Sequence, residues 1–431
     1  MNTIIRKKYL DSLQARMNNG LIKVITGVRR SGKSYLLFNL FYKFLKDSGI
    51  KDECIITLAL DDDINEKYRE PSELSKYIRS LVKETEKTYY ILLDEIQFAI
   101  SDEEYAKPEM PKKIFSVLNG FLHLNNVDIY VTGSNSKFLS SDVLTEFRGR
   151  GDEIHVLPFS FSEYLQGYSG DVYHAWADYV MYGGLPLVLG MKTDEQKASY
   201  LMNLFEETYL KDIIAHNKIE KTQELEDLIN ILASGTGSLT NPTRILQTFK
   251  TVLHSKISIN TIIKYLDYLK DAFLVNEVNR YDVKGRKYIG SPNKYYFEDV
   301  GLRNARLNFR QTEETHLMEN VIYNELRYRG FNVDVGIVEK RERDENGKEK
   351  RTQYEIDFVA TQGSKKYYIQ SAFFLGSAEK IEQEKKSLKT VSDSFKKIII
   401  VKDIIKPLRD EDGILTISLF DFLQNENSLE I

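Results

Sequence analysis

Cysteine is almost absent from this 431-residue chain, and its single cysteine, Cys54, excludes an intrachain disulfide. Cysteine and histidine also occur in no spacing that would hold a structural zinc ion. No run approaches the roughly 18 apolar residues of a membrane span. Residues 1–8 lack the apolar stretch of a signal peptide. These absences predict a cytoplasmic protein without a membrane segment.

A large excess of charge is lacking as well, because the formal net charge is only −4. The molecule as a whole therefore has no general attraction for nucleic acid, and any such interface must be a local patch. Charged residues make up 29% and hydrophobic residues 42% of the chain, which is typical of globular proteins. The length exceeds what one core supports, so several domains are expected.

One short segment carries a specific chemistry, because residues 27–34 form a complete G-x-x-x-x-G-K-S motif. An apolar strand over Leu21–Thr26 precedes it, and the spacing predicts a helix over Tyr35–Leu45. A loop between a strand and a helix points backbone N–H groups at one place, at the positive end of the helix dipole. The motif predicts an ATP-binding loop in which Lys33 reaches the β- and γ-phosphates and Ser34 binds Mg²⁺. The residues expected to hold the nucleotide are Gly27, Val28, Arg29, Arg30, Ser31, Gly32, Lys33, Ser34 and Tyr35.

A second apolar strand, Tyr89–Asp94, ends in two carboxylates at a suitable distance along the chain. We expect Asp94 to hold Mg²⁺ through water and Glu95 to orient and polarise the attacking water. A carboxylate in that second role indicates hydrolysis of ATP rather than transfer of its phosphate to another substrate.

Further polar residues follow a third apolar strand, Asp128–Gly133. If that strand lies beside the P-loop strand, Asn135 or the preceding serine faces the γ-phosphate, although such residues also serve as strand-end caps. Arg148 and Arg150 come later in the chain. They are candidates for an arginine finger that acts on the ATP of a neighbouring subunit in a homo-oligomer, or they are a solvated basic pair.

Together these motifs resemble the AAA+ ATPases, and more narrowly the prokaryotic ATP-binding proteins in which an AAA domain precedes a conserved C-terminal domain of unknown function. The likeness covers nearly the whole chain and helps fold assignment more than function. The matching segments are residues 22–34, 132–136, 149–150, 157–164, 182–186, 294–304 and 319–326.

The expected fold is α/β, with a P-loop AAA+ parallel sheet followed by three smaller units. The expected domains are the ATPase core (1–160), a helical lid (161–220), a winged helix-turn-helix (221–309) and a restriction-endonuclease-like domain (310–431). Ser160 and Glu163 form a plausible capping box at the start of the lid. The charged segment from Glu339 to Arg351 indicates an exposed hairpin tip or loop.

The helix-turn-helix segment from Asn241 to Lys294 contains ten Lys and Arg residues against four Asp and Glu residues. This local excess fits contact with the phosphates of duplex DNA. Winged-helix units also serve only as protein docking or lid modules, so both interpretations stay open.

Residues 310–431 resemble the restriction-endonuclease-like nucleases. The resemblance implies a metal site built from Glu319 on a helix, Asp357 on the second strand and Gln370 on the third. Ala372 stands where that family has its catalytic lysine. We therefore favour a nuclease-like fold with degraded or absent activity, although two carboxylates and a glutamine can still bind a divalent ion.

The leading hypothesis is an Mg²⁺-dependent AAA+ ATPase that acts as a conformational switch, coupled to DNA or to an unidentified protein partner. A second hypothesis is a DNA-binding protein in which ATP controls the winged helix and the nuclease-like domain. A third is a signalling or assembly scaffold with little turnover. The sequence does not decide between a monomer and a homo-oligomer.

Overall fold

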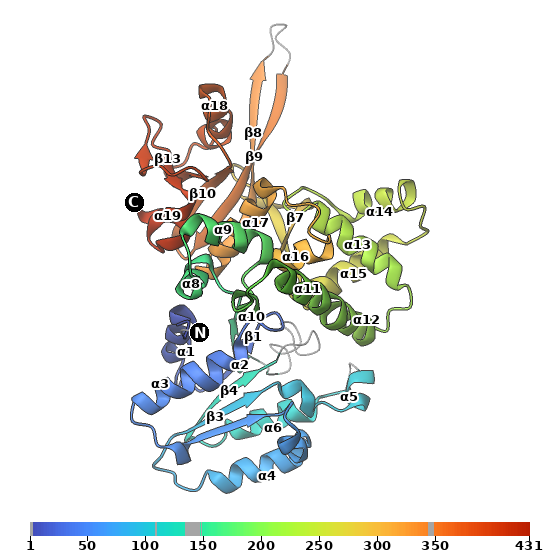
Figure 1. The fold of residues 1–431 in the computed structure, drawn as a ribbon, viewed down its shortest axis with the longest axis vertical. Helices are drawn as coiled ribbons and strands as arrows, with labels where there is room; N and C mark the ends of the chain where they lie inside the picture. The colour runs from blue at the N-terminus through green and yellow to red at the C-terminus, as the bar shows by residue number, and fades with distance from the viewer. Residues whose placement is uncertain (1–2, 108–109, 134–146, 148, 344–348) are drawn as a thin grey trace.

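The computed structural model describes residues 3–107, 110–133, 147, 149–343 and 349–431. In Figure 1 the blue and cyan N-terminal segments form a lower lobe, and the green to red segments form an upper lobe. Helix α10 (Pro186–Leu189) lies where the two lobes meet, beside the start of α2.

The lower lobe is built on five parallel strands in the order β2-β3-β4-β1-β5. The P-loop strand therefore lies beside β4, as predicted. One face of the sheet packs against α4 and α6, and the other packs against α1 and the helix that follows the P-loop. Coverage of both faces explains why β2, β3 and β4 are nearly continuous runs of apolar residues, whereas the edge strand β5 is more polar. The strands are β1 (Ile22–Thr26), β2 (Ile55–Ala59), β3 (Tyr89–Asp94), β4 (Val127–Thr132) and β5 (Gly151–His155).

The helix after the P-loop is longer than predicted and contains a π-helical turn over Leu36–Phe41. This turn joins α2 and α3 into one continuous helix. The helices of this lobe are α1 (Lys7–Ala15), α2 (Lys33–Tyr35), α3 (Tyr42–Asp47), α4 (Pro71–Leu81), α5 (Asp102–Ala106) and α6 (Lys113–Phe121). Short 3₁₀ turns occur at Asp52–Cys54, Asp63–Arg69 and Ile96–Ala99.

A helical segment follows the ATPase sheet. The predicted capping box is present at its start: Ser160 accepts a hydrogen bond from the Glu163 N–H, and the Glu163 carboxylate accepts one from the Ser160 N–H. A second π-helical turn, Phe205–Leu210, joins its last two helices. The helices are α8 (Phe161–Gly167), α9 (Val172–Tyr182), α10, α11 (Asp194–Leu204) and α12 (Lys211–Asn217).

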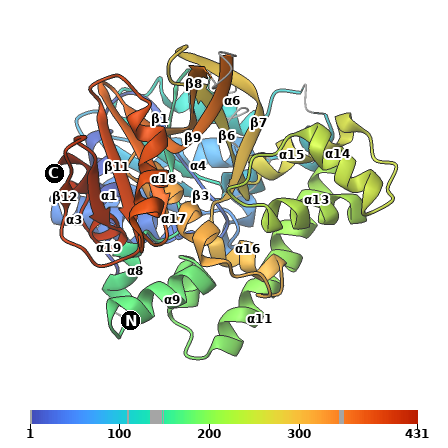
Figure 2. The ribbon, with the colours of Figure 1, turned by 90° about the horizontal axis from the view of Figure 1, so that it is seen from above.

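Three helices and a β-hairpin come next, and their assignment as a winged helix stays a prediction. They are α13 (Thr222–Ser234), α14 (Pro242–Thr251), α15 (Ile259–Asp271), β6 (Val275–Asp282) and β7 (Lys287–Phe297). In the view of Figure 2, α13–α15 lie on the opposite side of the molecule from α18 and α19.

The last part of the chain continues the same sheet. Strands β6 and β7 belong to an eight-stranded sheet in the order β12-β13-β11-β10-β9-β8-β6-β7, and β6 pairs in parallel with β8. The predicted boundary between residues 309 and 310 therefore does not separate two sheets. The remaining elements are α16 (Val300–Arg306), α17 (Glu314–Tyr328), β8 (Asn332–Arg343), β9 (Glu349–Gln362), β10 (Lys365–Ala372), α18 (Ala378–Lys389), β11 (Lys396–Val401), β12 (Leu408–Arg409), β13 (Leu415–Ser418), α19 (Leu419–Gln424) and the 3₁₀ turn Ser428–Glu430.

Within the segment from Glu339 to Arg351, predicted as an exposed hairpin tip or loop, residues 339–343 and 349–351 continue the β8–β9 pairing, and residues 344–348 lie outside the described residues. The pairing of the two strands continues from Glu339 opposite Gln353 to Arg343 opposite Glu349. Figure 1 shows these strands projecting beyond the rest of the sheet.

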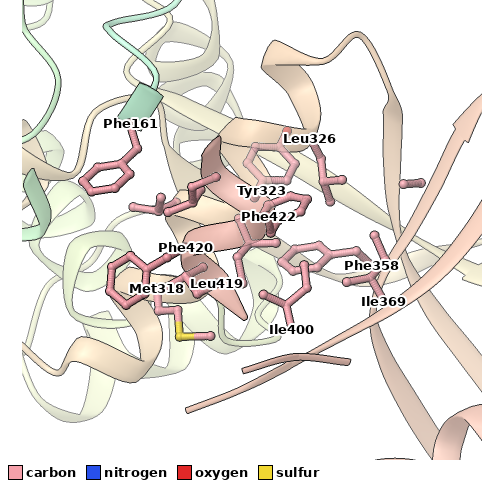
Figure 3. Packing of buried hydrophobic residues seen from close by; sticks show 14 of the residues in the cluster. Phe161, Met318, Tyr323, Leu326, Phe358, Ile369, Ile400, Leu419, Phe420 and Phe422 are labelled. Carbon is pink, nitrogen blue, oxygen red and sulfur yellow. The ribbon is translucent and has the colours of Figure 1, made fainter. Parts of the chain in front are cut away.

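Two hydrophobic clusters tie the helical segment to its surroundings. The first joins α8 and α9 to α17, α19 and the C-terminal sheet, and Figure 3 shows Phe161 of α8 near Phe420 and Met318. The second joins Val28 of the P-loop to the helices from α10 to α15. The segment that follows the ATPase sheet therefore contacts both the nucleotide loop and the C-terminal region. Within the described ranges, no helix has the length and apolar character needed to cross a membrane.

Candidate nucleotide-binding site

The P-loop lies at the carboxyl end of β1, where the chain turns into α2. Gly27 has a φ of 134°, and a side chain there would collide with the carbonyl oxygen of Val156. Gly32 has a φ of 92°, a left-handed conformation that glycine adopts without strain. The two glycines therefore let the loop pack tightly against the residue after β5 and then start the helix.

Lys33 is buried inside the loop that it follows. Its Nζ donates hydrogen bonds of 2.9 Å to the carbonyl oxygens of Gly27 and Val28. Burial lowers the pKa of Lys33 to about 8, and the negative charges of Glu95 and Asp94 act in the opposite direction. The ammonium group is thus held by neutral carbonyl oxygens, and an anion such as phosphate would stabilise it more strongly.

Asp94 is the last residue of β3, and Glu95 follows it. Strand β4 lies between β3 and the P-loop strand β1. The Thr132 hydroxyl at the end of β4 donates to Asp94 and accepts a hydrogen bond of 3.1 Å from the Glu95 N–H. Burial raises the pKa of Asp94 to about 6, although hydrogen bonds from Thr132 and Ser34 act to lower it. Ser34 and Asp94, the two predicted Mg²⁺ ligands, are therefore neighbours in this structure.

Arg6, before α1, holds the P-loop from outside the motif. Its guanidinium donates to the carbonyl oxygens of Ser31 at 2.9 Å and Leu157 at 2.8 Å. It also forms a 2.9 Å ion pair with Glu163, and both side chains are buried. A buried pair with this many hydrogen bonds fixes geometry, because removing one partner would leave a buried charge uncompensated.

The helical segment contacts the P-loop directly. The Tyr209 hydroxyl donates a 2.7 Å hydrogen bond to the carbonyl oxygen of Arg29, and the Arg29 side chain forms an ion pair with Asp212. Pro186 of α10 lies beside Gly32, so that a Cβ on Gly32 would be 3.5 Å from the proline ring. Any rearrangement of the loop must therefore be accommodated by α10–α12.

Two acidic residues at the end of β7 also reach this region. Glu298 pairs with His155 of β5 at 2.9 Å. Asp299 accepts a 2.8 Å hydrogen bond from the Gly184 N–H, next to α10, and burial raises the pKa of Asp299 to about 6. The C-terminal region is thus attached to the ATPase sheet and to the turn that touches the P-loop.

The structure brings together residues 27–35 with Asp94 and Glu95. Arg30 has a φ of 66° and is exposed, and Tyr35 is 45% exposed. Asn135 and Arg148 lie outside the described residues. Arg150 is exposed immediately before β5, and its roles as an arginine finger or a solvated cation stay predictions.

The residues present fit a magnesium–nucleotide complex. The Ser31 hydroxyl is buried and has no hydrogen-bond partner in the structure, which leaves a polar atom of the loop available to a phosphate oxygen. Lys33 belongs to the same motif, and the hydroxyl of Ser34 and the carboxylate of Asp94 supply the oxygen ligands that Mg²⁺ prefers.

The C-terminal carboxylates surround a second buried lysine, Lys294 of β7. Its Nζ lies 2.8 Å from Glu319 Oε1, 2.8 Å from Glu355 Oε1 and 3.7 Å from Asp357 Oδ1. The carboxylates raise the pKa of Lys294 although burial opposes them. Burial raises the pKa of Asp357 to about 7. The Tyr296 hydroxyl also donates to Glu319 at 2.5 Å.

The expected metal site in this region has Glu319 and Asp357 together, but Gln370 accepts a 3.4 Å hydrogen bond from the Ser387 hydroxyl. Over the part of the chain that the structure describes, no three His, Cys, Asp or Glu side chains are grouped so as to hold a metal. A divalent ion between the carboxylates would face the Lys294 ammonium at close range. The cluster as arranged therefore does not fit a divalent ion.

Several residues of these sites were missed by sequence reasoning. Arg6 and Glu163 are 157 residues apart, and no local pattern links them. Thr132 ends the apolar strand β4. Because β4 lies beside β3, a polar residue at its end could have been expected near Asp94. Lys294 opens the apolar run Tyr295–Phe297, where a charged residue on a buried strand indicates a partner.

The chain is similar in sequence to known families and proteins. Residues 19–165 match the family model described as an AAA domain, and residues 173–313 match a domain of unknown function, DUF8612. A protein of Haemophilus influenzae described as uncharacterized is 32% identical over 425 residues, covering 97% of this chain and 98% of that protein. An uncharacterized protein of Methanocaldococcus jannaschii is 29% identical over 390 residues, covering 86% of this chain and 79% of its own length.

Solved structures with detectable similarity include the ORC2 protein of Aeropyrum pernix, at 13% identity and a TM-score of 0.35, covering 75% of this chain and 95% of that one. Cdc6p of Pyrobaculum aerophilum has 11% identity and a TM-score of 0.29, covering 73% of this chain and 97% of its own. At TM-scores this low, neither similarity adds to the assignment.

The parallel sheet, the P-loop and the acidic end of β3 define a P-loop nucleotide-binding protein of the AAA+ class. The full-length match to the Haemophilus protein makes the assignment narrower. The chain belongs to the prokaryotic AAA+ family in which an AAA domain is followed by a conserved C-terminal domain of unknown function.

Proposed function

We propose that this protein is an Mg²⁺-dependent ATPase that works as a conformational switch. The observation that carries the proposal is the Lys33 ammonium, which is buried against two carbonyl oxygens and faces the acidic end of β3. In the proposed reaction Lys33 binds the phosphates and Ser34 and Asp94 hold Mg²⁺, which neutralises phosphate charge. Glu95 orients the attacking water and accepts its proton.

The switch follows from what the P-loop touches. Phosphate binding would draw Lys33 away from the carbonyl oxygens of Gly27 and Val28, which changes the loop. The loop contacts Tyr209 and Pro186, and those helices pack on the C-terminal region. A local change at the phosphate site is therefore passed to packed elements that link the two lobes.

The test is ATP hydrolysis by the full-length chain and by Glu95→Gln, with Glu103→Gln as the control. Glu103 is an exposed glutamate that pairs with Lys107 on α5, so its loss leaves the site unchanged. Loss of the base predicts a fall in kcat of about 10²–10⁴-fold for Glu95→Gln with ATP binding retained. Equal rates for the three proteins would refute hydrolysis at this site.

A second candidate function, duplex DNA binding, is supported by the exposed cations of the α13–β7 region. Lys264 on α15 and Lys284 and Arg286 in the β6–β7 turn are exposed. Neutralising these three should weaken DNA binding and reduce its salt dependence, because each phosphate contact releases counterions. Absence of binding at low salt would remove this candidate and leave protein docking as the role of the winged helix.

We also propose a homo-oligomer in which Arg150 acts on a neighbour's nucleotide. Exposure of Arg150 supports that role. The proposed arrangement predicts that an inactive Arg150→Ala chain and an inactive Lys33→Ala chain restore activity when mixed. No recovery on mixing would favour the solvated-cation role.

A further inference from the structure

A cavity of about 590 Å³ lies away from the P-loop, at the carboxyl ends of β10 and β11. These strands are parallel, and the carboxyl edge of parallel strands is where the following loops diverge and leave room for a ligand. Helix α9 forms the opposite wall. The volume is within the range of small-molecule sites, which commonly lie between packed units of a chain.

Aromatic rings form the inner wall of the cavity. The rings of Tyr173 and Phe420 are 5.3 Å apart at 82°, and those of Trp176 and Phe420 are 6.1 Å apart at 84°. The Trp176 Nε1 donates a 2.7 Å hydrogen bond to Glu314, which fixes the indole orientation. Figure 3 shows Phe420 at the border of the C-terminal core, so this wall has a rigid support.

Large apolar side chains remain exposed around the opening. Tyr173 is 49% exposed, Phe374 is 60% exposed and Ile404 is 68% exposed, and all three line the same cavity. Exposing three such residues at one place is unfavourable in water, and such patches commonly mark binding sites.

The charges at the cavity favour a cation. Lys402 forms a 2.5 Å ion pair with Glu314, and its Nζ lies 4.7 Å from the centre of the Phe373 ring, so the wall already holds one ammonium group. Asp403 lines the cavity and forms no ion pair with any residue that the structure describes. The lining therefore combines one uncompensated carboxylate with the negative faces of aromatic rings.

We propose that this cavity is a binding site for a small organic cation that carries an ammonium or guanidinium group. The cation stacks on the aromatic wall and pairs with Asp403, while its apolar part covers Phe374 and Ile404. A ligand there contacts α9, the helix that ends at the Gly183–Pro186 turn beside the P-loop. The site is independent of the ATPase proposal.

Trp176 is the single tryptophan of the chain, so intrinsic fluorescence reports on this wall without labelling. The probes are phenethylammonium, phenylacetate and 2-phenylethanol, which share a size and differ in charge. We expect a saturable change of Trp176 fluorescence with phenethylammonium, at about tenfold higher affinity than phenylacetate. Calorimetry on the same samples provides the affinity without relying on fluorescence.

Asp403→Asn is the charge variant, and Asp11→Asn on the exposed side of α1 is its control. Asp403→Asn should lower phenethylammonium affinity about threefold to fivefold and leave 2-phenylethanol unchanged. Equal binding of the three probes, no saturable binding in calorimetry, or an Asp403→Asn chain that binds the cation normally would each overturn the proposal.

Discussion

Two buried lysines, Lys33 and Lys294, sit beside carboxylates in opposite lobes, and their surroundings differ. Lys33 donates to two carbonyl oxygens, and burial lowers its pKa to about 8. Lys294 has Glu319 and Glu355 at 2.8 Å, and the carboxylates raise its pKa. Among the described residues, the first lysine has no counter-charge in contact, whereas the second has more than one.

This difference separates the two lysines by what they can bind. The Lys33 site can bind an anion, whereas the charge of Lys294 is already balanced by carboxylates of the chain. A buried ammonium held only by neutral carbonyls is stabilised when phosphate arrives. A buried ammonium among three carboxylates occupies the position that a divalent ion would need. The comparison therefore assigns ligand chemistry to the P-loop and a structural role to Lys294, which ties β7 to α17 and β9.

Removing Lys294 should have the largest effect on stability. Lys294→Met leaves the buried Asp357 and the partly exposed Glu319 and Glu355 without their cation, and we expect a loss of ~3–5 kcal/mol from the free energy of unfolding of the C-terminal lobe. Urea denaturation followed by far-UV circular dichroism measures it. The control, Lys287→Met, removes an exposed lysine from the same strand and should change stability little. A Lys294→Met chain as stable as this control would contradict the structural role of Lys294.

Removing Lys33 should instead affect activity. Lys33→Met takes away the charge that binds the phosphates, and kcat for ATP hydrolysis should fall about 10²–10³-fold. Stability should be nearly unchanged, because the hydrogen bonds that the ammonium makes to the described residues go to backbone carbonyl oxygens. Lys43→Met, an exposed position on α3, is the control. A large loss of stability for Lys33→Met would mean that Lys33, like Lys294, has a structural role.

Nucleotide binding should have an optimum between about pH 6 and pH 8. Asp94 must be ionised to hold Mg²⁺, and its pKa of about 6 means that binding is lost as pH falls below that value. Lys33 must be protonated, and its pKa of about 8 in the free chain means that binding is lost as pH rises above it. Each limb should fall about tenfold per pH unit. Titration of Mg·ATP by calorimetry from pH 5 to 9 measures the profile, and a flat profile would contradict it.

The smallest expected effect is Mn²⁺ binding to Glu319, Glu355 and Asp357 after Lys294 has been replaced. In the Lys294→Met chain the carboxylates lack an internal cation, so Mn²⁺ should raise the Tm by about 3 °C or more by binding the folded state. In the wild-type chain no Mn²⁺-dependent rise in Tm should depend on Asp357. Wild type and Asp357→Asn should therefore show the same Tm shift with Mn²⁺. An equal Mn²⁺ shift in wild type, abolished by Asp357→Asn, would mean that Lys294 does not occupy the cation position.

The ATPase sheet was predictable because its information is local. The P-loop is eight consecutive residues, and β3 and β4 are apolar runs that end in an acidic or a small polar residue. The three predicted strands around the site differ from the observed ones by one residue at most, and the polar residues after the third strand suggested its place beside β1.

The C-terminal cluster was not predictable, because Lys294 comes from a strand that the sequence assigned to the winged helix. The sequence has Ala372 where the related nucleases have a lysine. In the structure a different lysine, Lys294 of β7, lies beside the carboxylates, because β6 and β7 extend the C-terminal sheet. Pairing of β6 with β8 is a long-range contact that no residue pattern signals. The last elements, β12, β13 and α19, are short, and their sequence carried no clear periodicity.

The most direct test of the comparison is Mn²⁺ binding to the full-length chain, followed by electron paramagnetic resonance with and without ATP. We predict that ATP brings one tightly bound Mn²⁺, which Asp94→Asn removes and Asp357→Asn leaves in place. We also predict that the nucleotide-free chain holds no Mn²⁺ that depends on Asp357. A nucleotide-free wild-type chain that binds Mn²⁺, and loses it in Asp357→Asn, would contradict the account.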